Sequence, residues 1–266
     1  MNARHSLAGL RRDWTTLGEA DPLWAVCVDP ARRGGRWDLD EFLATGRAEI
    51  AGAMCELDRL GLCARRDSAL DFGCGVGRLT SALSRYFGTV TGVDISPPML
   101  EHARRILASD PGCRVMLGDS PDLAAFSDDS FDLVYSSLVL QHMPPGLADA
   151  YLVEFVRVVR PGGAIVLVVP EAHLRTPRGL VYAYAPHSVI GWLQRTVFGY
   201  PAPMRMNEVP ADRVRRVVEP GGAQLVASRP HPIPGSHWQM ARHFVSVARR
   251  PDQAVGGSSQ TSGSSR

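Results

Sequence analysis

The chain has 266 residues, 45% of them apolar, and a formal net charge of +2. This length predicts one large domain with a modest appendage, and the apolar share is ordinary for a globular protein. The small net charge and the lack of basic runs argue against nucleic acid as a partner, so we expect none.

The first sixty residues predict an appendage to the main domain. Residues 1–36 are rich in Trp and are interrupted by Pro and Gly, which indicates an irregular segment. A cap helix is predicted over 38–60, because its apolar residues recur at helical spacing and Gly61 follows its last turn. We therefore expect three parts: an N-terminal segment at 1–60, a main domain at 61–250 and a tail at 251–266.

Strands and helices alternate through the main domain. The predicted strands cover 68–72, 90–94, 113–117, 131–136 and 164–169, and the predicted helices cover 78–87, 97–109 and 147–160. A helix at 211–218 and strands at 223–228 and 243–248 follow. This alternation predicts an α/β fold with a doubly wound, mostly parallel sheet and helices on both faces.

Two regions interrupt the alternation. Residues 170–210 contain several aromatic residues and prolines, which predicts a lid-like insertion over a ligand. Its aromatic side chains would offer apolar and stacking surface to an acceptor, namely Tyr182, Tyr184, Trp192 and Phe198. Residues 251–266 are rich in Gly, Ser and Gln, which predicts a disordered tail.

The segment ALDFGCGVGR at 69–78 is the most informative motif. Gly73, Gly75 and Gly77 allow a sharp turn and a close approach to a ligand, and Asp71 adds a negative charge at the mouth of the loop. The spacing departs from the dinucleotide pattern G-x-G-x-x-G, and the Lys of a phosphate loop is missing from a chain without any lysine. The loop therefore favours a ligand with a positive amino group over a polyphosphate.

The cysteines and the apolar runs bear on the compartment. Five cysteines form no C-x-x-C pair, which favours a reduced protein without a cysteine metal site. No apolar run approaches the ~20 residues that span a bilayer, and no apolar signal core follows the N-terminus. We expect a cytoplasmic protein with no membrane partner.

Further motifs follow the glycine loop beside the predicted strands. They are Asp94, the turn at 118–120, the segment 131–142 and the Arg-Pro-Gly-Gly turn at 160–163, which comes before the strand at 164–169. Together with the loop, this ordered set resembles the class I, Rossmann-like S-adenosylmethionine-dependent methyltransferases, especially the bacterial group that acts on small molecules. The resemblance covers about residues 38–170. It implies a seven-stranded sheet whose last strand is antiparallel, with S-adenosylmethionine as the cofactor at the carboxyl ends of the strands.

The resemblance implies a role for each acidic residue of the set. Asp94 is expected to accept hydrogen bonds from both ribose hydroxyls, and Asp71 to bind the methionyl amino group directly or through water. Asp119 is expected to accept the adenine amino proton, with Ser120 nearby. Local sequence alone equally allows Asp119 to be an ordinary turn residue.

The remaining candidates have two interpretations each. Ile95 and Met99 either form apolar walls around the adenine or belong to the core. Arg78 either meets the cofactor carboxylate or, as the sequence favours, faces solvent from its helix. The complete set of expected cofactor-binding residues is Asp71, Gly73, Cys74, Gly75, Gly77, Asp94, Ile95, Met99, Asp119, Ser120 and Ser137.

The fourth strand leads into the place where the resemblance puts the methyl-transfer centre. His142 lies there, and an imidazole that titrates near neutral pH suits a general base that takes a hydroxyl proton. The second interpretation is a histidine that packs the loop and bonds a backbone carbonyl. His187, in the insertion, is the second candidate base. No metal is expected, because no ligand spacing for one is present.

The sequence thus predicts methyl transfer to a small-molecule acceptor, with a hydroxyl oxygen favoured. Nitrogen and carbon acceptors stay open. So do three further functions: a non-catalytic S-adenosylmethionine-binding protein, a sulfonium-using enzyme that moves another group, and an NAD-dependent oxidoreductase. The chain is expected to be a monomer or a homodimer.

Overall fold

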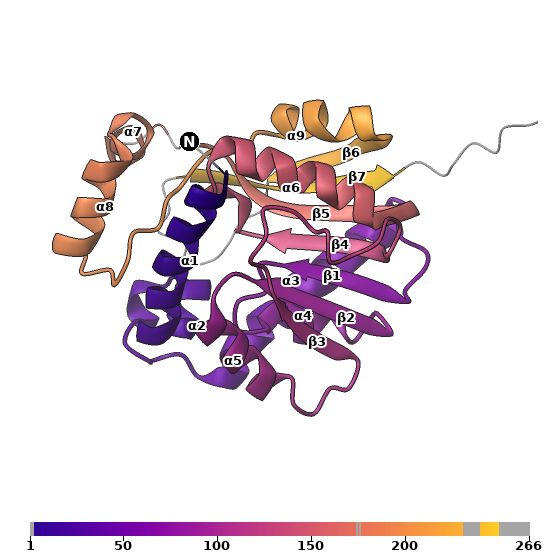
Figure 1. Ribbon diagram of the computed structural model, residues 1–266, viewed down its shortest axis with the longest axis horizontal. Coiled ribbons are helices and arrows are strands. Elements are labelled where there is room, and N and C mark those ends of the chain that lie inside the picture. The colour runs from indigo at the N-terminus through magenta and orange to yellow at the C-terminus, as the bar shows by residue number, and fades with distance from the viewer. Residues whose placement is uncertain (1–2, 174, 176, 231–239, 250–266) are drawn as a thin grey trace, which may run out of the picture.

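The computed structural model describes residues 3–173, 175, 177–230 and 240–249 (Figure 1). The predicted tail at 251–266 lies outside the described residues. The α-helices are α1 (Ala3–Ala20), α2 (Pro22–Val26), α3 (Leu39–Arg59), α4 (Arg78–Leu83), α5 (Pro97–Ile106), α6 (Pro145–Val158), α7 (Pro177–Tyr184), α8 (His187–Thr196) and α9 (Ala211–Val218). Short 3-10 turns are η1 (Pro30–Arg32), η2 (Leu140–His142) and η3 (Glu219–Gly221).

The strands form one seven-stranded sheet in the order β3-β2-β1-β4-β5-β7-β6. They are β1 (Ser68–Phe72), β2 (Thr89–Asp94), β3 (Cys113–Leu117), β4 (Phe131–Ser137), β5 (Val159–His173), β6 (Ala223–Pro230) and β7 (Met240–Arg249). The first five strands pair in parallel, and β7 is antiparallel to both β5 and β6. This confirms the predicted fold class.

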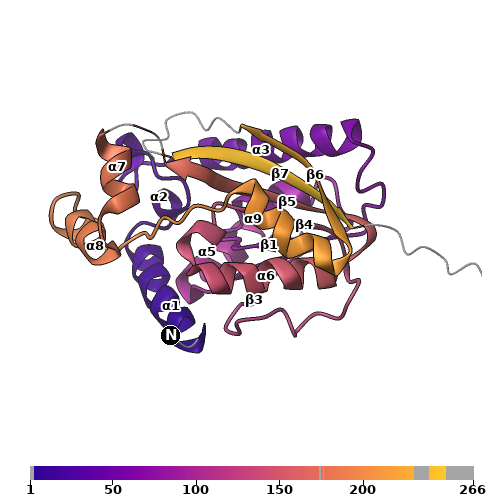
Figure 2. The same cartoon turned by 90° about the horizontal axis from the view of Figure 1, so that it is seen from above.

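The buried side chains of β5 alternate between the two faces of the sheet, and helices cover both faces. On β5, Ala164, Val166 and Val168 join a core with α3 and α4, whereas Ile165 and Leu167 join a core with α6 and α9. Successive side chains of a strand point to opposite faces, so an almost wholly apolar strand requires cover on both. Figure 2 shows α3 on one side of the sheet and α6 on the other.

The strand order reverses at β1, which lies between β2 and β4. In open α/β sheets a ligand crevice forms at such a switch point, outside the carboxyl ends of the strands. The glycine loop follows β1, Asp94 ends β2, and Ser137 ends β4. The topology therefore brings these three segments to one sheet edge.

The prediction of an irregular segment over 1–36 is wrong, because α1 and α2 occupy most of it. Leu7, Leu10 and Leu17 are buried on one side of α1, with Trp14 between them in sequence. Their spacing of three, four and three residues is that of a helical stripe. The Pro and Gly that indicated irregular structure lie further along the segment, beyond this stripe.

Helices α3 and α4 pack together through a glycine. A Cβ atom placed on Gly46 of α3 would lie 2.7 Å from the backbone oxygen of Arg78 and 2.7 Å from its Cγ. A carbonyl oxygen cannot rotate away as a side chain can, so this helix pair approaches closely only without a side chain at position 46.

We expect Gly46→Ala to destabilise the protein by about 1–3 kcal/mol, because overpacking exceeds the gain in helix propensity of about 1 kcal/mol. The matched control is Gly52→Ala on the same helix, where an added Cβ meets nothing within 4 Å. This control should stabilise the protein by about 0.5–1 kcal/mol. Urea unfolding of both variants checks the pair, and equal stabilities would contradict the proposed close contact.

Candidate functional site

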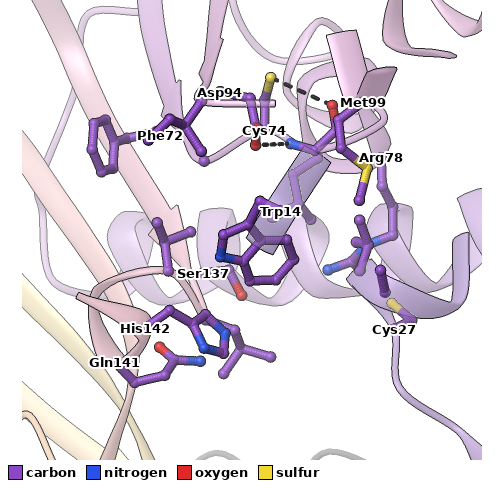
Figure 3. Close-up of a pocket in the computed structure, with 18 of the residues that line it drawn as sticks. Trp14, Cys27, Phe72, Cys74, Arg78, Asp94, Met99, Ser137, Gln141 and His142 are labelled. Carbon is purple, nitrogen blue, oxygen red and sulfur yellow. Dashed lines mark hydrogen bonds between the residues drawn. The ribbon is translucent and has the colours of Figure 1, made fainter. Parts of the chain in front are cut away.

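A cavity of about 540 Å³ lies at the carboxyl ends of β1, β2 and β4. The glycine loop and the ends of these strands form one wall, and α1, α3 and the segment from 25 to 29 form another. Figure 3 places the indole of Trp14 beside His142, with Cys74 and Asp94 across the cavity. The cavity lining is mainly apolar, with a few polar groups, which is typical of a small-molecule site.

The glycine loop turns with its backbone against other segments of the wall. Gly73 and Gly75 have φ angles of +78° and +53°. A Cβ on Gly73 would lie 2.2 Å from a methyl of Val139, and one on Gly75 would lie 2.7 Å from a methyl of Val26. Both residues line the cavity, whereas Gly77 caps α4 behind it. The loop backbone therefore forms part of the cavity surface.

Cys74 also lines the cavity, with its side chain buried. Its Sγ lies 2.9 Å from the position that a Cβ on Gly92 of β2 would take. Burial raises the pKa of this thiol well above its usual value, so the group is a neutral thiol at physiological pH. The small side chain fits the space between the loop and β2.

Asp94 joins the glycine loop to β2. Its Oδ2 accepts a hydrogen bond from the Gly75 amide at 2.8 Å, and its Oδ1 accepts one from the Ser96 amide at 2.8 Å. Desolvation raises the pKa of this carboxyl, and the backbone amides of Ser96, Gly75 and Ile95 counteract the shift by stabilising the charged form. A carboxylate has about four acceptor positions, more than these amides use, and the residue lines the cavity.

Asp71 lies behind the loop, outside the cavity wall. It is buried, and its Oδ2 accepts a hydrogen bond from the Thr80 hydroxyl at 2.7 Å. Desolvation raises its pKa to about 7, opposed by the Thr80 bond and by the Arg78 charge. The structure thus places this carboxyl under the loop and outside the lining of the cavity.

Arg78 is buried, so the expectation that it faces solvent is wrong. Its guanidinium pairs with Glu49 of α3 at 2.9 Å and donates to the Thr45 hydroxyl at 3.3 Å. The Tyr135 hydroxyl donates to the same Glu49 carboxylate at 3.1 Å. Because the partner lies on another helix, nothing in the local sequence around position 78 indicates this pair.

His142 lies in η2 with a defined ring orientation. Its Nδ1 is 2.5 Å from the Arg205 carbonyl oxygen, and its ring meets Trp14 edge-on at 4.9 Å between centroids. A carbonyl only accepts, so in the neutral ring Nδ1 carries the proton and Nε2 is the nitrogen that accepts one. The ring lines the cavity and is 7% exposed.

Three polar atoms on residues of the cavity wall have no hydrogen-bond partner among the described residues. They are the Ser137 hydroxyl, Oε1 of Gln141 and Nε of Arg78. Gln141 is 2% exposed, and its backbone carbonyl accepts two hydrogen bonds from Asn207. Buried polar atoms are generally satisfied, so these three are candidates for ligand contacts.

The sequence candidates separate into two groups. The cavity wall contains Gly73, Cys74, Gly75, Asp94, Ile95, Met99, Ser137 and His142. The residues Asp71, Gly77, Asp119, Ser120 and His187 are not part of it. Ser120 instead donates to Asp122 and accepts from the Tyr151 hydroxyl, and His187 is exposed at the start of α8.

The apolar cavity wall draws on the N-terminal segment and the 170–210 insertion, but through other side chains than the expected aromatics of the insertion. Trp14, Trp37, Met204 and Met206 line the cavity. The aromatic side chains expected to do so, Tyr184, Trp192 and Phe198, are exposed, while the side chain of Tyr182 lies outside the described set. The helical stripe of α1 was the available signal for Trp14, whereas no local pattern indicates Met204 or Met206.

Two further features of the described residues are groups of side chains that could bind a metal ion and helices that could span a membrane. In the parts of the chain that the structure describes, His, Cys, Asp and Glu side chains nowhere gather in a group of three that could hold a metal ion. Over the same residues, every helix is too short or too polar to cross a membrane.

The buried carboxyl of Asp71 predicts a pH-dependent stability. Because its pKa of about 7 in the folded state exceeds the usual value of 3.8, folding binds a proton in this range. The contribution is most favourable below the unfolded pKa and is lost as the pH rises towards 7. Relative to Asp71→Asn, the wild type should lose on the order of 4 kcal/mol between about pH 4 and about pH 7, at about 1.4 kcal/mol per pKa unit.

Urea unfolding of both proteins across this range measures the difference. Asp212→Asn, at an exposed position on α9, is the matched control. A constant difference between wild type and Asp71→Asn would show that the folded state does not raise this pKa.

Residues 70–167 match the protein family described as "Methyltransferase domain". The chain is 30% identical over 174 residues to the 2-methyl-6-phytyl-1,4-hydroquinone methyltransferase of Synechocystis sp., covering 65% of this chain and 53% of that protein. It is 41% identical over 101 residues to the demethylmenaquinone methyltransferase of Staphylococcus aureus, covering 37% of this chain and 41% of that protein. The chain therefore spans about half or less of the length of these relatives.

The fold is also found in solved structures of methyltransferases. The magnesium protoporphyrin IX methyltransferase of Synechocystis PCC 6803, solved with bound SAH, aligns with a TM-score of 0.59 at 18% identity, over 90% of this chain and 97% of that one. A structure of the same enzyme with bound SAM aligns with a TM-score of 0.59 at 16% identity, over 94% and 98%. Residues 70–167 therefore form a methyltransferase domain, and the chain has the Rossmann-like fold of these solved methyltransferases.

Proposed function

We propose that the protein transfers a methyl group from S-adenosylmethionine to a hydroxyl oxygen of a small, largely apolar metabolite. The observation that carries the proposal is one cavity with two kinds of wall. The glycine loop and Asp94 lie on one side of it, and His142 and Gln141 lie on the other. A bound cofactor and an acceptor would meet between these walls.

The first wall fits the cofactor. Gly73 and Gly75 present bare backbone, and Asp94 offers its remaining acceptor positions to the ribose hydroxyls. Ile95 and Met99 line the same region and give apolar surface for the adenine. Asp71, under the loop, adds negative charge near the cationic end of the ligand rather than a direct contact.

The second wall suits a hydroxyl-bearing acceptor. The cofactor supplies an electrophilic methyl group on an already activated sulfonium. The work left to the chain is to align the acceptor, exclude water and remove a proton. His142 would take the hydroxyl proton on Nε2, while its Nδ1 proton stays bonded to the Arg205 carbonyl. Because the one hydroxyl proton goes to His142, Oε1 of Gln141 would accept from another polar hydrogen of a bound ligand.

The apolar lining points to an acceptor with a large nonpolar part. Leu7, Leu10, Trp37, Met143 and Met206 are among the apolar residues that line the cavity. Two relatives are named for a hydroquinone and for demethylmenaquinone, and such ring compounds have the size and polarity that this lining would accept. We therefore propose a ring compound as the acceptor, and the choice of its hydroxyl oxygen rests on His142. Product analysis by NMR separates an O-methyl product from a ring C-methyl product, and a C-methyl product would contradict the oxygen assignment.

Asp94→Ala should weaken S-adenosylmethionine binding by at least about tenfold, because a well-made charged hydrogen bond contributes roughly 1.5–3 kcal/mol. Calorimetry with S-adenosylmethionine, S-adenosylhomocysteine and NAD measures the effect. Asp212→Ala, on the exposed side of α9, is the control and should bind as the wild type does. Unchanged affinity in a folded Asp94→Ala protein would remove Asp94 from the site, and binding of NAD alone would contradict the cofactor assignment.

His142→Asn should lower turnover by about a hundredfold while leaving cofactor affinity nearly unchanged, because general-base catalysis contributes about 10²–10⁴. The Asn amide keeps a donor for the Arg205 carbonyl, which separates the base role from the packing role. His187→Asn, at an exposed position outside the cavity wall, is the control and should retain turnover. Full activity of His142→Asn would assign His142 to packing alone.

A further inference from the structure

Helices α7 and α8 stand at one end of the molecule, beyond the edge of the sheet, in both views (Figures 1 and 2). Large apolar side chains gather on this pair and are strongly exposed, with Trp192 at 56% and Tyr184 at 83%. We call the set the α7–α8 surface; its residues are Leu180, Val181, Tyr184, Val189, Trp192, Val197 and Phe198. Exposed apolar groups that cluster in this way mark an interaction site.

The inner face of α8 explains why these side chains point outward. Ile190, Gly191 and Gln194 are buried and recur at helical spacing. The Gln194 side chain donates to the Met204 carbonyl at 3.0 Å and accepts from the Met204 amide at 2.9 Å. This double hydrogen bond fixes α8 to the segment that carries Met204 and Met206 into the cavity wall. The outer face of α8, with Val189 and Trp192, is left without cover within the described chain.

The charge of the same region has one sign. Residues 172–207 contain no Asp or Glu, but they include Arg175, Arg178, Arg195 and Arg205. Asp13 of α1 is the acidic group near Arg195 and Arg205. On α9, by contrast, Arg215 pairs with Asp212 of the same helix. A basic region with exposed Trp and Tyr matches the composition of interfacial membrane-binding segments.

We propose that the α7–α8 surface docks on an anionic lipid bilayer, with its aromatic side chains at the headgroup level and its arginines facing acidic headgroups. The sequence alone led to an expectation of no membrane partner, because that expectation tested only for spanning segments. Peripheral docking needs exposed apolar area and basic charge on one face, and both are present here. The hydrogen bonds between Gln194 and Met204 join the docked helix to the cavity wall. An apolar acceptor dissolved in the lipid would therefore be close to the cavity.

Co-sedimentation of the full chain with vesicles tests this proposal without any assay of methyl transfer. We expect binding to phosphatidylcholine vesicles that contain phosphatidylglycerol, weaker binding to phosphatidylcholine alone, and a loss of binding at high salt. The double variant Tyr184→Glu, Trp192→Glu should lower the bound fraction at least about tenfold. It removes aromatic area that the bilayer would bury and places negative charge against acidic headgroups. Trp192→Ala should give a smaller loss in the same direction.

The matched control is Val153→Glu, which places the same charge at a 54% exposed valine on α6, away from this surface. It should bind vesicles as the wild type does. The proposal would be overturned if the wild type does not bind vesicles, or if the double variant binds them as well as the wild type does. Sedimentation velocity tests whether a second copy of the chain occupies this surface instead. A wild-type dimer, a monomeric double variant and no lipid binding would assign the surface to a second copy.

Discussion

The hydrogen bonds between the glycine loop and the end of β2 are the interaction on which the site depends. The amides of Gly73 and Cys74 both donate to the Val93 carbonyl, at 2.7 and 3.0 Å. One residue further along each segment, the Gly75 amide donates to the Asp94 carboxylate. These bonds hold the loop across the edge of the sheet, so that bare backbone and a carboxylate face the same cavity. A side chain at position 73 would collide with Val139, so glycine is a condition for this arrangement.

Helix α1 completes the cavity by joining elements that the sheet keeps apart. The Ser96 hydroxyl donates to the Trp14 carbonyl at 3.1 Å, which fixes α1 to the start of α5. Further along α1, a Cβ on Gly18 would lie 3.1 Å from that same hydroxyl, so the contact is close along the helix. Leu7 and Leu10 meanwhile enter the core on the α6 face of the sheet. One helix thus contacts the end of β2 and, through Trp14, the ring of His142.

The sequence predicted those parts whose signals are local. The strands at 68–72 and 113–117 and the helix at 211–218 have the bounds that the structure gives them, because short apolar runs there end at clear turn residues. The glycine loop and Asp94 were found for the same reason. What was missed depends on pairing between distant segments, as in the pair of Arg78 with Glu49. A bond from His142 to a backbone carbonyl was one of two interpretations, but the sequence did not identify its partners, Arg205 and Trp14. Local sequence could equally not tell which face of α8 turns inward, so Trp192 was assigned to the cavity.

The electrostatics of the cavity favour a cation over a neutral ligand. Arg78, the basic group beside the loop, is already paired with Glu49, so the acidic groups Asp94 and Asp71 retain their effect. Desolvation raises the pKa of both carboxyls, which means that burial disfavours their charged forms. A positive charge held near them stabilises the carboxylates and is stabilised in return. Methyl transfer converts a sulfonium into a neutral thioether, so the part of this attraction that acts on the sulfur is lost in the product, while the attraction on the amino group stays. The same acidic wall that favours binding before transfer would therefore favour release after it.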